Sequence, residues 1–111
     1  MSELHWVAYF FGGAFVTNAI PHFVSGVCGE PFQSPFAQPH GKGLSSSTVN
    51  VLWGFFNLAV GYLLTCRVGD FALRALGDVL PFGLGILVMG LVSARLFGPL
   101  HGGDRPRRTV P

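Results

Sequence analysis

Polar residues that could bind a ligand interrupt the first hydrophobic segment of the chain. Asn18, His22 and Ser25 follow one another at steps of four and three residues, so a helix would place them on one face. Pro21 cannot donate a hydrogen bond to the carbonyl of Thr17, which leaves a free acceptor near the same level. Such groups are costly inside an apolar segment and usually face a bundle interior or a cavity. They could form a small binding site, with His22 as a haem ligand, a metal ligand or a proton acceptor.

A structural role is the alternative for the same residues. Asn18 and His22 would satisfy a backbone that is kinked at Pro21 and would join the first helix to the second by hydrogen bonds, which are common between membrane helices. A single histidine is a weak signal for a metal or haem, so we favour the structural role. The competing hypothesis is a ligand site formed by Asn18, His22, Ser25 and Asn57, and the sequence does not identify its ligand.

The second hydrophobic segment carries a stripe of small and polar residues. Asn50, Gly54, Asn57 and Gly61 recur at steps of four, three and four, and Thr65 adds a further step of four. Small residues let membrane helices approach closely, and asparagine side chains bond across helices, so the stripe predicts a packing seam. A polar pathway is disfavoured because neither asparagine titrates. Two partners remain open for the seam, namely Ala8, Gly12 and Ala19 of the first helix or Gly83, Gly90 and Ala94 of the third.

Composition places these segments in a membrane. Half of the 111 residues are hydrophobic and only 11% are charged, whereas a soluble domain has about 25% charged residues. Residues 6–29 and 49–66 form uncharged runs, and residues 79–94 form a third run that reaches Leu100 if Arg95 extends toward the headgroups. We therefore predict an all-α integral membrane protein with three transmembrane helices, the first of them kinked at Pro21.

The connecting segments divide this chain into a transmembrane domain, residues 1–100, and a polar, basic C-terminal tail, residues 101–111. Between the first two helices, Pro31, Phe32, Pro35 and Phe36 predict an irregular interfacial loop whose rings meet lipid or a partner, or fold back on the bundle.

The ends of the second and third helices carry their own signals. Ser46 or Ser47 is expected to cap the second helix. Residues 71–76 are expected to form a short interfacial helix, after which Asp78 would cap the third helix.

Basic residues predict the orientation. Three spans put Lys42, Arg95 and the tail arginines on one side, against Arg67 and Arg74 on the other. The excess of positive charge places the C-terminus in the cytoplasm and the N-terminus outside. The tail arginines are Arg105, Arg107 and Arg108.

The two cysteines close successive antiparallel spans. Cys28 and Cys66 would therefore lie at opposite faces, about 30 Å apart, which is too far for a disulfide. We expect both to be buried free thiols.

Residues 18–64, with the motifs NAIPHF and PFQSPF, resemble a group of small bacterial inner-membrane proteins of unassigned function. The resemblance covers less than half of the chain. It implies a bacterial origin and brings no activity with it.

Catalytic motifs are missing from the sequence. It has no phosphate-binding glycine loop, nucleophile elbow or paired carboxylates, and the spacing of Cys28, His40 and His101 matches no zinc pattern. We therefore expect a non-enzymatic inner-membrane protein that acts by helix association, as an accessory subunit or a homo-oligomer. Its partners would be lipid and other membrane helices or itself, and not nucleic acid. The alternative is a membrane protein that binds a small ligand, haem or metal at Asn18 and His22.

Overall fold

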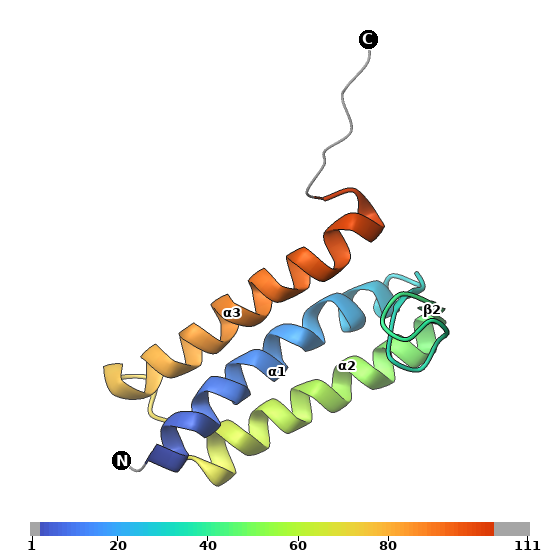
Figure 1. Ribbon diagram of the computed structural model, residues 1–111. Coiled ribbons are helices and arrows are strands. Elements are labelled where there is room, and N and C mark those ends of the chain that lie inside the picture. Colours follow the sequence, from blue (N-terminus) through green and yellow to red (C-terminus); the bar gives the residue numbers. More distant parts are fainter. Residues whose placement is uncertain (1–2, 104–111) are drawn as a thin grey trace.

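The structure, a computed structural model, describes residues 3–103 and consists of three long helices with a small hairpin (Figure 1). The helix α2 continues directly into a π-helical segment, η1, and the two strands lie between α1 and α2. The elements in chain order are α1 (Glu3–Val27), β1 (Phe32–Gln33), β2 (Leu44–Ser45), α2 (Ser47–Tyr62), η1 (Leu63–Val68) and α3 (Leu76–His101).

Each of the three helical spans is long and apolar enough to cross a membrane, which confirms the predicted number of candidate spans. The spans of 25, 22 and 26 residues correspond to about 33 to 39 Å at 1.5 Å per residue, against a hydrocarbon core of about 30 Å. Pro21 lies inside α1, and the helix continues past it for another six residues to Val27. The bend at Pro21 stays a prediction.

The helix ends agree with the sequence in one case and differ in another. Ser46 caps α2, because its hydroxyl accepts a hydrogen bond from the Val49 backbone nitrogen at 3.2 Å. The prediction that Asp78 caps α3 is wrong. The helix begins earlier, after Ala75, so Asp78 lies in its first turn. The Asp78 carboxylate instead accepts a bond from the Ala72 backbone nitrogen at 2.9 Å. This bond folds the link back on α3, and a turn replaces the short helix predicted for residues 71–76.

The loop between α1 and α2 contains a two-stranded antiparallel sheet that the all-helical prediction did not include. Phe32 lies opposite Ser45 and Gln33 opposite Leu44. The Ser34 and Ser45 hydroxyls bond to each other at 2.5 Å, and the Ser34 backbone nitrogen donates to the Gly43 carbonyl at 3.3 Å. The hairpin thus fixes a segment whose prolines prevent a helix.

The helix α1 is central and packs against both α2 and α3 along its length (Figure 1). Glycines make both contacts close. A Cβ atom added at Gly54 of α2 would lie 2.8 Å from the backbone nitrogen of Phe23, and one added at Gly85 of α3 would lie 3.1 Å from that of Ala14. Neither helix could take a larger side chain at these points without moving away from α1.

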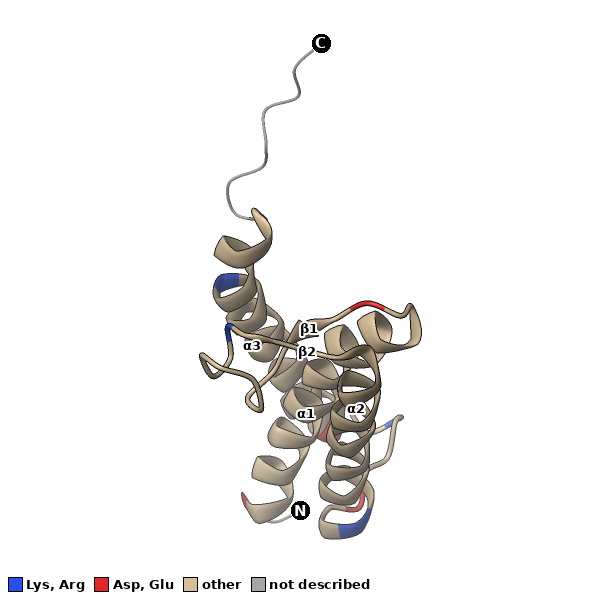
Figure 2. Ribbon diagram, turned by 90° about the vertical axis from the view of Figure 1, so that its right-hand side faces the viewer, with Lys and Arg blue, Asp and Glu red and all other residues tan. Residues whose placement is uncertain are grey.

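The two ends of the bundle carry different segments. The hairpin and the C-terminal end of α3 lie at one end, and the link from η1 to α3 lies at the other (Figure 1). Lys42 lies in the loop between β1 and β2 and Arg95 in the C-terminal part of α3, whereas Arg67 lies in η1 and Arg74 in the link to α3. Basic residues therefore occur toward both ends of the bundle (Figure 2). The arginines predicted for the tail lie outside the described residues.

The two cysteines are free and exposed. Cys28 follows α1 at the hairpin end, and Cys66 lies in η1 toward the other end. The expectation that they are buried is wrong: Cys28 lies in the exposed turn after α1, and Cys66 lies on η1 next to the buried Thr65 but is itself exposed.

Candidate functional site

Two side-chain hydrogen bonds connect the polar residues of α1 to the stripe on α2. The Asn18 amide donates to the Asn57 side-chain oxygen at 3.0 Å, and His22 Nδ1 bonds to the Asn50 side-chain oxygen at 2.8 Å. Asn50 and Asn57 are 0% exposed and His22 is 3% exposed. The polar groups of the first helix therefore face the second helix and find their partners there.

Asn50 joins three segments through one amide group. Its nitrogen lies within hydrogen-bond distance of the carbonyls of Phe32 at 3.1 Å, Ser45 at 3.1 Å and Ser46 at 3.0 Å. Because the nitrogen is the donor in these contacts, the Asn50 oxygen is an acceptor, and His22 must donate to it from Nδ1. Asn50 thereby ties both strands of the hairpin and the start of α2 to α1.

Aromatic rings enclose the His22 imidazole. Ring centroids of Phe32, Trp53 and Phe97 lie 5.3, 6.3 and 6.4 Å from that of His22, and all three meet it edge to face. A haem plane could reach this imidazole only by displacing at least one ring. The geometry suits a histidine that is packed and hydrogen-bonded within the bundle.

The residues predicted as one ligand site form separate pairs. Asn18 meets Asn57, whose own amide nitrogen donates to the Trp53 carbonyl at 2.8 Å. His22 meets Asn50, which the ligand-site prediction did not include. Ser25 is half-buried and belongs to neither bond.

The stripe predicted as a packing seam lies against α1. Asn50, Gly54, Asn57 and Gly61 are the buried residues of α2. Thr65 continues them on η1 and is 6% exposed, and its buried hydroxyl has no hydrogen-bond partner in the described part of the chain. Of the two partners left open by the sequence, the seam therefore packs against α1 through Gly12 and its neighbours rather than against α3.

Histidines outside α1 have other partners. His40 Nε2 lies 2.6 Å from the Gln38 amide nitrogen, and His101 Nε2 lies 2.8 Å from the Gln33 side-chain oxygen. Within residues 3–103, no three His, Cys, Asp or Glu side chains lie close enough together to hold a metal ion.

The phenylalanines of the loop take different positions. Phe32 folds inward and stacks on His101, with ring centroids 5.3 Å apart, and it also contacts Phe97 at 4.9 Å. Phe36 is 62% exposed and rests on Trp53 at 5.0 Å. Pro31 and Pro35 are exposed.

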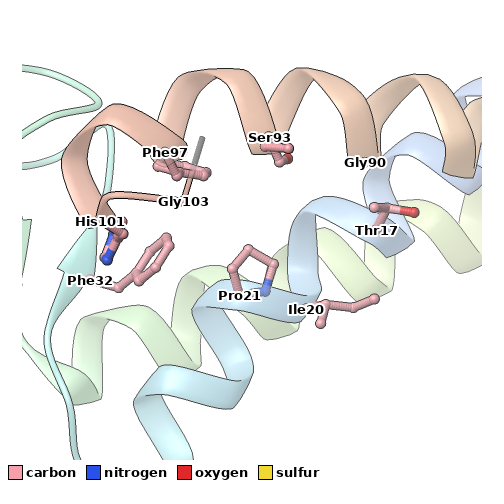
Figure 3. Close-up of a pocket in the computed structure, with 11 residues that line it drawn as sticks. Thr17, Ile20, Pro21, Phe32, Gly90, Ser93, Phe97, His101 and Gly103 are labelled. Atoms are coloured by element: carbon pink, nitrogen blue, oxygen red, sulfur yellow. The ribbon is translucent and has the colours of Figure 1, made fainter. Parts of the chain in front are cut away.

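A groove of about 550 Å³ lies between α1 and α3, and Phe32, whose ring also contacts His22, is one of the residues that line it (Figure 3). Pro21, Phe32, Phe97 and His101 form its wall near the hairpin, and Thr17 and Gly90 form the part deeper along the bundle. The sequence predicts His101 in the tail and Phe97 only as part of the extended third span. The only sequence signal for them is that residues 90, 94, 97 and 101 fall at helical spacing, which becomes informative once α3 is known to extend through His101.

Comparison with known proteins adds no relative. The chain matches no protein-family model, and no curated protein or solved structure shows a significant similarity to it.

Proposed function

We propose that the chain is a multi-pass protein of the bacterial inner membrane that has no enzymatic activity and acts by helix association, as a homo-oligomer or as an accessory subunit of a membrane complex. The uncovered surface of α3 carries this proposal. Within the apolar 18-residue stretch of each helix, 11% of the α3 stretch is buried inside the protein, against 39% of the α1 stretch. The third helix thus has the most surface left for a partner.

The surface of α3 has the residues that helix association requires. Gly83, Leu87, Gly90 and Ala94 recur at steps of four, three and four, the same spacing as the α2 seam. A Cβ atom added at Gly83 or Gly90 would meet nothing within 4 Å. Small residues on an uncovered face let a second helix approach closely in lipid.

The paired polar residues support a structural role for Asn18 and His22. Both bond to α2 asparagines, and both of those asparagines are fully buried. The proposal includes a bend of α1 at Pro21, where the proline withholds a donor from the Thr17 carbonyl. The alternative, haem or metal at His22, requires the surrounding rings to move.

Gly83→Leu is expected to weaken association at least tenfold. The added side chain would stand on the stripe and hold the partner helix away, while the space around Gly83 leaves the fold of the subunit intact. Förster transfer between labelled copies in lipid vesicles measures self-association, and affinity purification from the native membrane measures binding to other subunits. Val88→Leu, on an exposed position of the same helix outside the stripe, is the matched control.

A protein that stays monomeric and unaccompanied in both assays would contradict association. An absorption spectrum of the same preparation tests the competing function. A Soret band that disappears in His22→Leu would replace association by haem binding.

Cysteine labelling tests the orientation. We expect an impermeant thiol reagent to label Cys28 from the cytoplasmic side and Cys66 from the outer side, because both thiols are exposed and they belong to opposite ends of the bundle. Labelling is measured in sealed vesicles of both orientations, with Cys28→Ser and Cys66→Ser as single-site controls. Labelling of both cysteines from one side would contradict three spans.

A further inference from the structure

A pocket of about 330 Å³ lies between the middle parts of α1 and α3. Its lining comes from residues 10–18 of α1 and residues 88–92 of α3, and both stretches lie near the centre of their helices. At that depth the hydrocarbon of a membrane would surround the pocket rather than water. The stripe proposed for helix association contributes no residue to it, since that stripe consists of Gly83, Leu87, Gly90 and Ala94.

Asn18 is the one polar side chain among the residues that line this pocket. Its partner Asn57 donates from the side-chain nitrogen to the Trp53 carbonyl, so the Asn57 oxygen is an acceptor and Asn18 must bond to it through its own nitrogen. The Asn18 oxygen and one of its N–H hydrogens therefore have no partner within residues 3–103. Asn18 is only partly buried, which leaves this amide within reach of a molecule in the pocket.

The free half of the Asn18 amide defines the polar group of a ligand. Lipid chains offer no hydrogen bond at this depth, and polar groups that are out of water are normally satisfied by a partner. A hydroxyl both donates and accepts, so one hydroxyl can meet the oxygen and the N–H of the same amide. The pocket therefore suits an apolar molecule that carries a hydroxyl group.

The rest of the lining defines the body of the ligand. Phe10, Phe11 and Phe15 of α1 supply aromatic rings, and Met89 of α3 supplies a thioether. Phe10 and Phe11 meet edge to face, with ring centroids 5.2 Å apart, and both phenylalanine rings and methionine sulfur pack well against a further aromatic ring. The volume of the pocket lies at the lower end of the range of about 300 to 1,000 Å³ for ligand sites, which suits a single substituted ring.

We propose that this pocket binds an apolar phenol, the class that includes the quinols, with the hydroxyl on the Asn18 amide and the ring against the phenylalanines of α1. Phenol binding goes beyond helix association and does not depend on it. The site shares only Asn18 with the ligand site expected from the sequence, because His22, Ser25 and Asn57 do not line the pocket. Asn18 thus serves α2 through one N–H and the ligand through its oxygen.

Saturation-transfer NMR of the full chain in deuterated detergent tests the site, with 4-butylphenol as the probe and protein-free micelles as the blank. We expect 4-butylphenol to bind roughly tenfold more tightly than 4-butylanisole, which carries a methyl group in place of the hydroxyl hydrogen and cannot donate. The third probe, 4-butylcyclohexanol, keeps the hydroxyl but has no aromatic ring, and it should also bind more weakly than the phenol.

Val92→Phe should lower phenol binding roughly tenfold, because its larger side chain fills the pocket from α3. Val92 is 42% exposed, so the fold can accept the change. Leu91→Phe is the matched control, since Leu91 is the neighbouring residue and is 59% exposed but does not line the pocket, and this variant should bind the phenol normally.

Asn18→Leu should abolish the preference for the phenol over the anisole. Because this change also breaks the bond to Asn57, Asn57→Leu is its control: it loses the same bond between helices but keeps the Asn18 oxygen, and it should retain the preference. If Asn18→Leu fails to fold, as judged by its circular dichroism, Val92→Phe decides the test.

Equal binding of the phenol and either of the other probes by the unmodified protein would overturn the proposal, as would unchanged phenol binding by Val92→Phe. A dimer that Val92→Phe converts to monomer would also overturn it, because a second copy would then occupy the pocket.

Association and phenol binding fail separately in these assays. Loss of association in Gly83→Leu with normal phenol binding supports both proposals, since Gly83 does not line the pocket. Normal phenol binding by a protein that never associates would reject the proposed function and leave the phenol site standing.

Discussion

Gly54→Leu is expected to force α1 and α2 apart and to lower the free energy of unfolding by roughly 3 kcal/mol, at the upper end of the cost of overpacking a close contact. An added Cβ would lie 2.8 Å from both the backbone nitrogen and the Cβ of Phe23, and 3.0 Å from its Cα. These atoms belong to the backbone of α1 or are attached directly to it, so no side-chain rotation can make room. Unfolding by sodium dodecyl sulfate in mixed micelles, followed by circular dichroism, measures the loss.

Leu63→Ala is the matched control for this prediction. Leu63 follows α2 directly but is 51% exposed, so its truncation removes little packing within the subunit and should cost well under 1 kcal/mol. Gly61→Leu should behave like Gly54→Leu, because an added Cβ there would lie 2.6 Å from Val16 Cγ2 and 3.1 Å from the Gly12 carbonyl. If Gly54→Leu and Gly61→Leu were as stable as Leu63→Ala, the stripe on α2 would not be an interface.

Asn50→Leu is expected to cost about 2 to 4 kcal/mol. The substitution removes the acceptor of His22, an interhelical bond worth about 0.6 to 2 kcal/mol. It also removes the donor shared by the carbonyls of Phe32, Ser45 and Ser46, at about 0.5 to 1.5 kcal/mol for a typical bond. Because the hairpin is attached to the bundle through Asn50, its amide protons should also exchange faster with solvent. Unfolding in mixed micelles and hydrogen exchange of the hairpin measure the two effects.

Asn50→Asp separates the two roles of the side chain, since it keeps the acceptor for His22 and loses the donor to the hairpin. We expect the aspartate variant to be nearly as destabilised as Asn50→Leu. A double-mutant cycle of Asn50→Leu with His22→Leu should show a coupling energy of about 0.5 to 3 kcal/mol, as contacting groups do. Strictly additive costs would mean that His22 does not depend on Asn50, and they would raise the case for a ligand at His22.

The helices could be predicted because their signals are local. Each span is a long run with few or no charged residues, and the Ser46 cap depends on a residue only three positions away. The stripe on α2 follows from helical periodicity alone, but its partner does not. The choice between α1 and α3 depends on which backbone approaches Gly54 and Gly61, and the sequence does not contain that distance.

The hairpin and the polar pairs could not be predicted for the same reason. Two-residue strands have no periodicity, and their pairing connects Phe32 to Ser45 across a proline-rich loop. The next helix offers two asparagines, Asn50 and Asn57, and the register of α1 against α2 decides which of them Asn18 and His22 meet. Likewise, Asp78 bonds to Ala72 rather than capping α3, a contact that depends on how the preceding link folds.

Two neighbouring glycines on α1 face different helices. A Cβ added at Gly12 would meet Thr65 and the Gly61 carbonyl, whereas one added at Gly13 would meet the Phe82 carbonyl of α3. One helix therefore serves two partners that share no extended contact with each other within residues 3–103. During synthesis α1 and α2 can pair before α3 exists, and α3 then docks on a finished surface. If the bundle opens in the reverse order, α3 detaches first, while the α1–α2 pair and its buried asparagines stay in place.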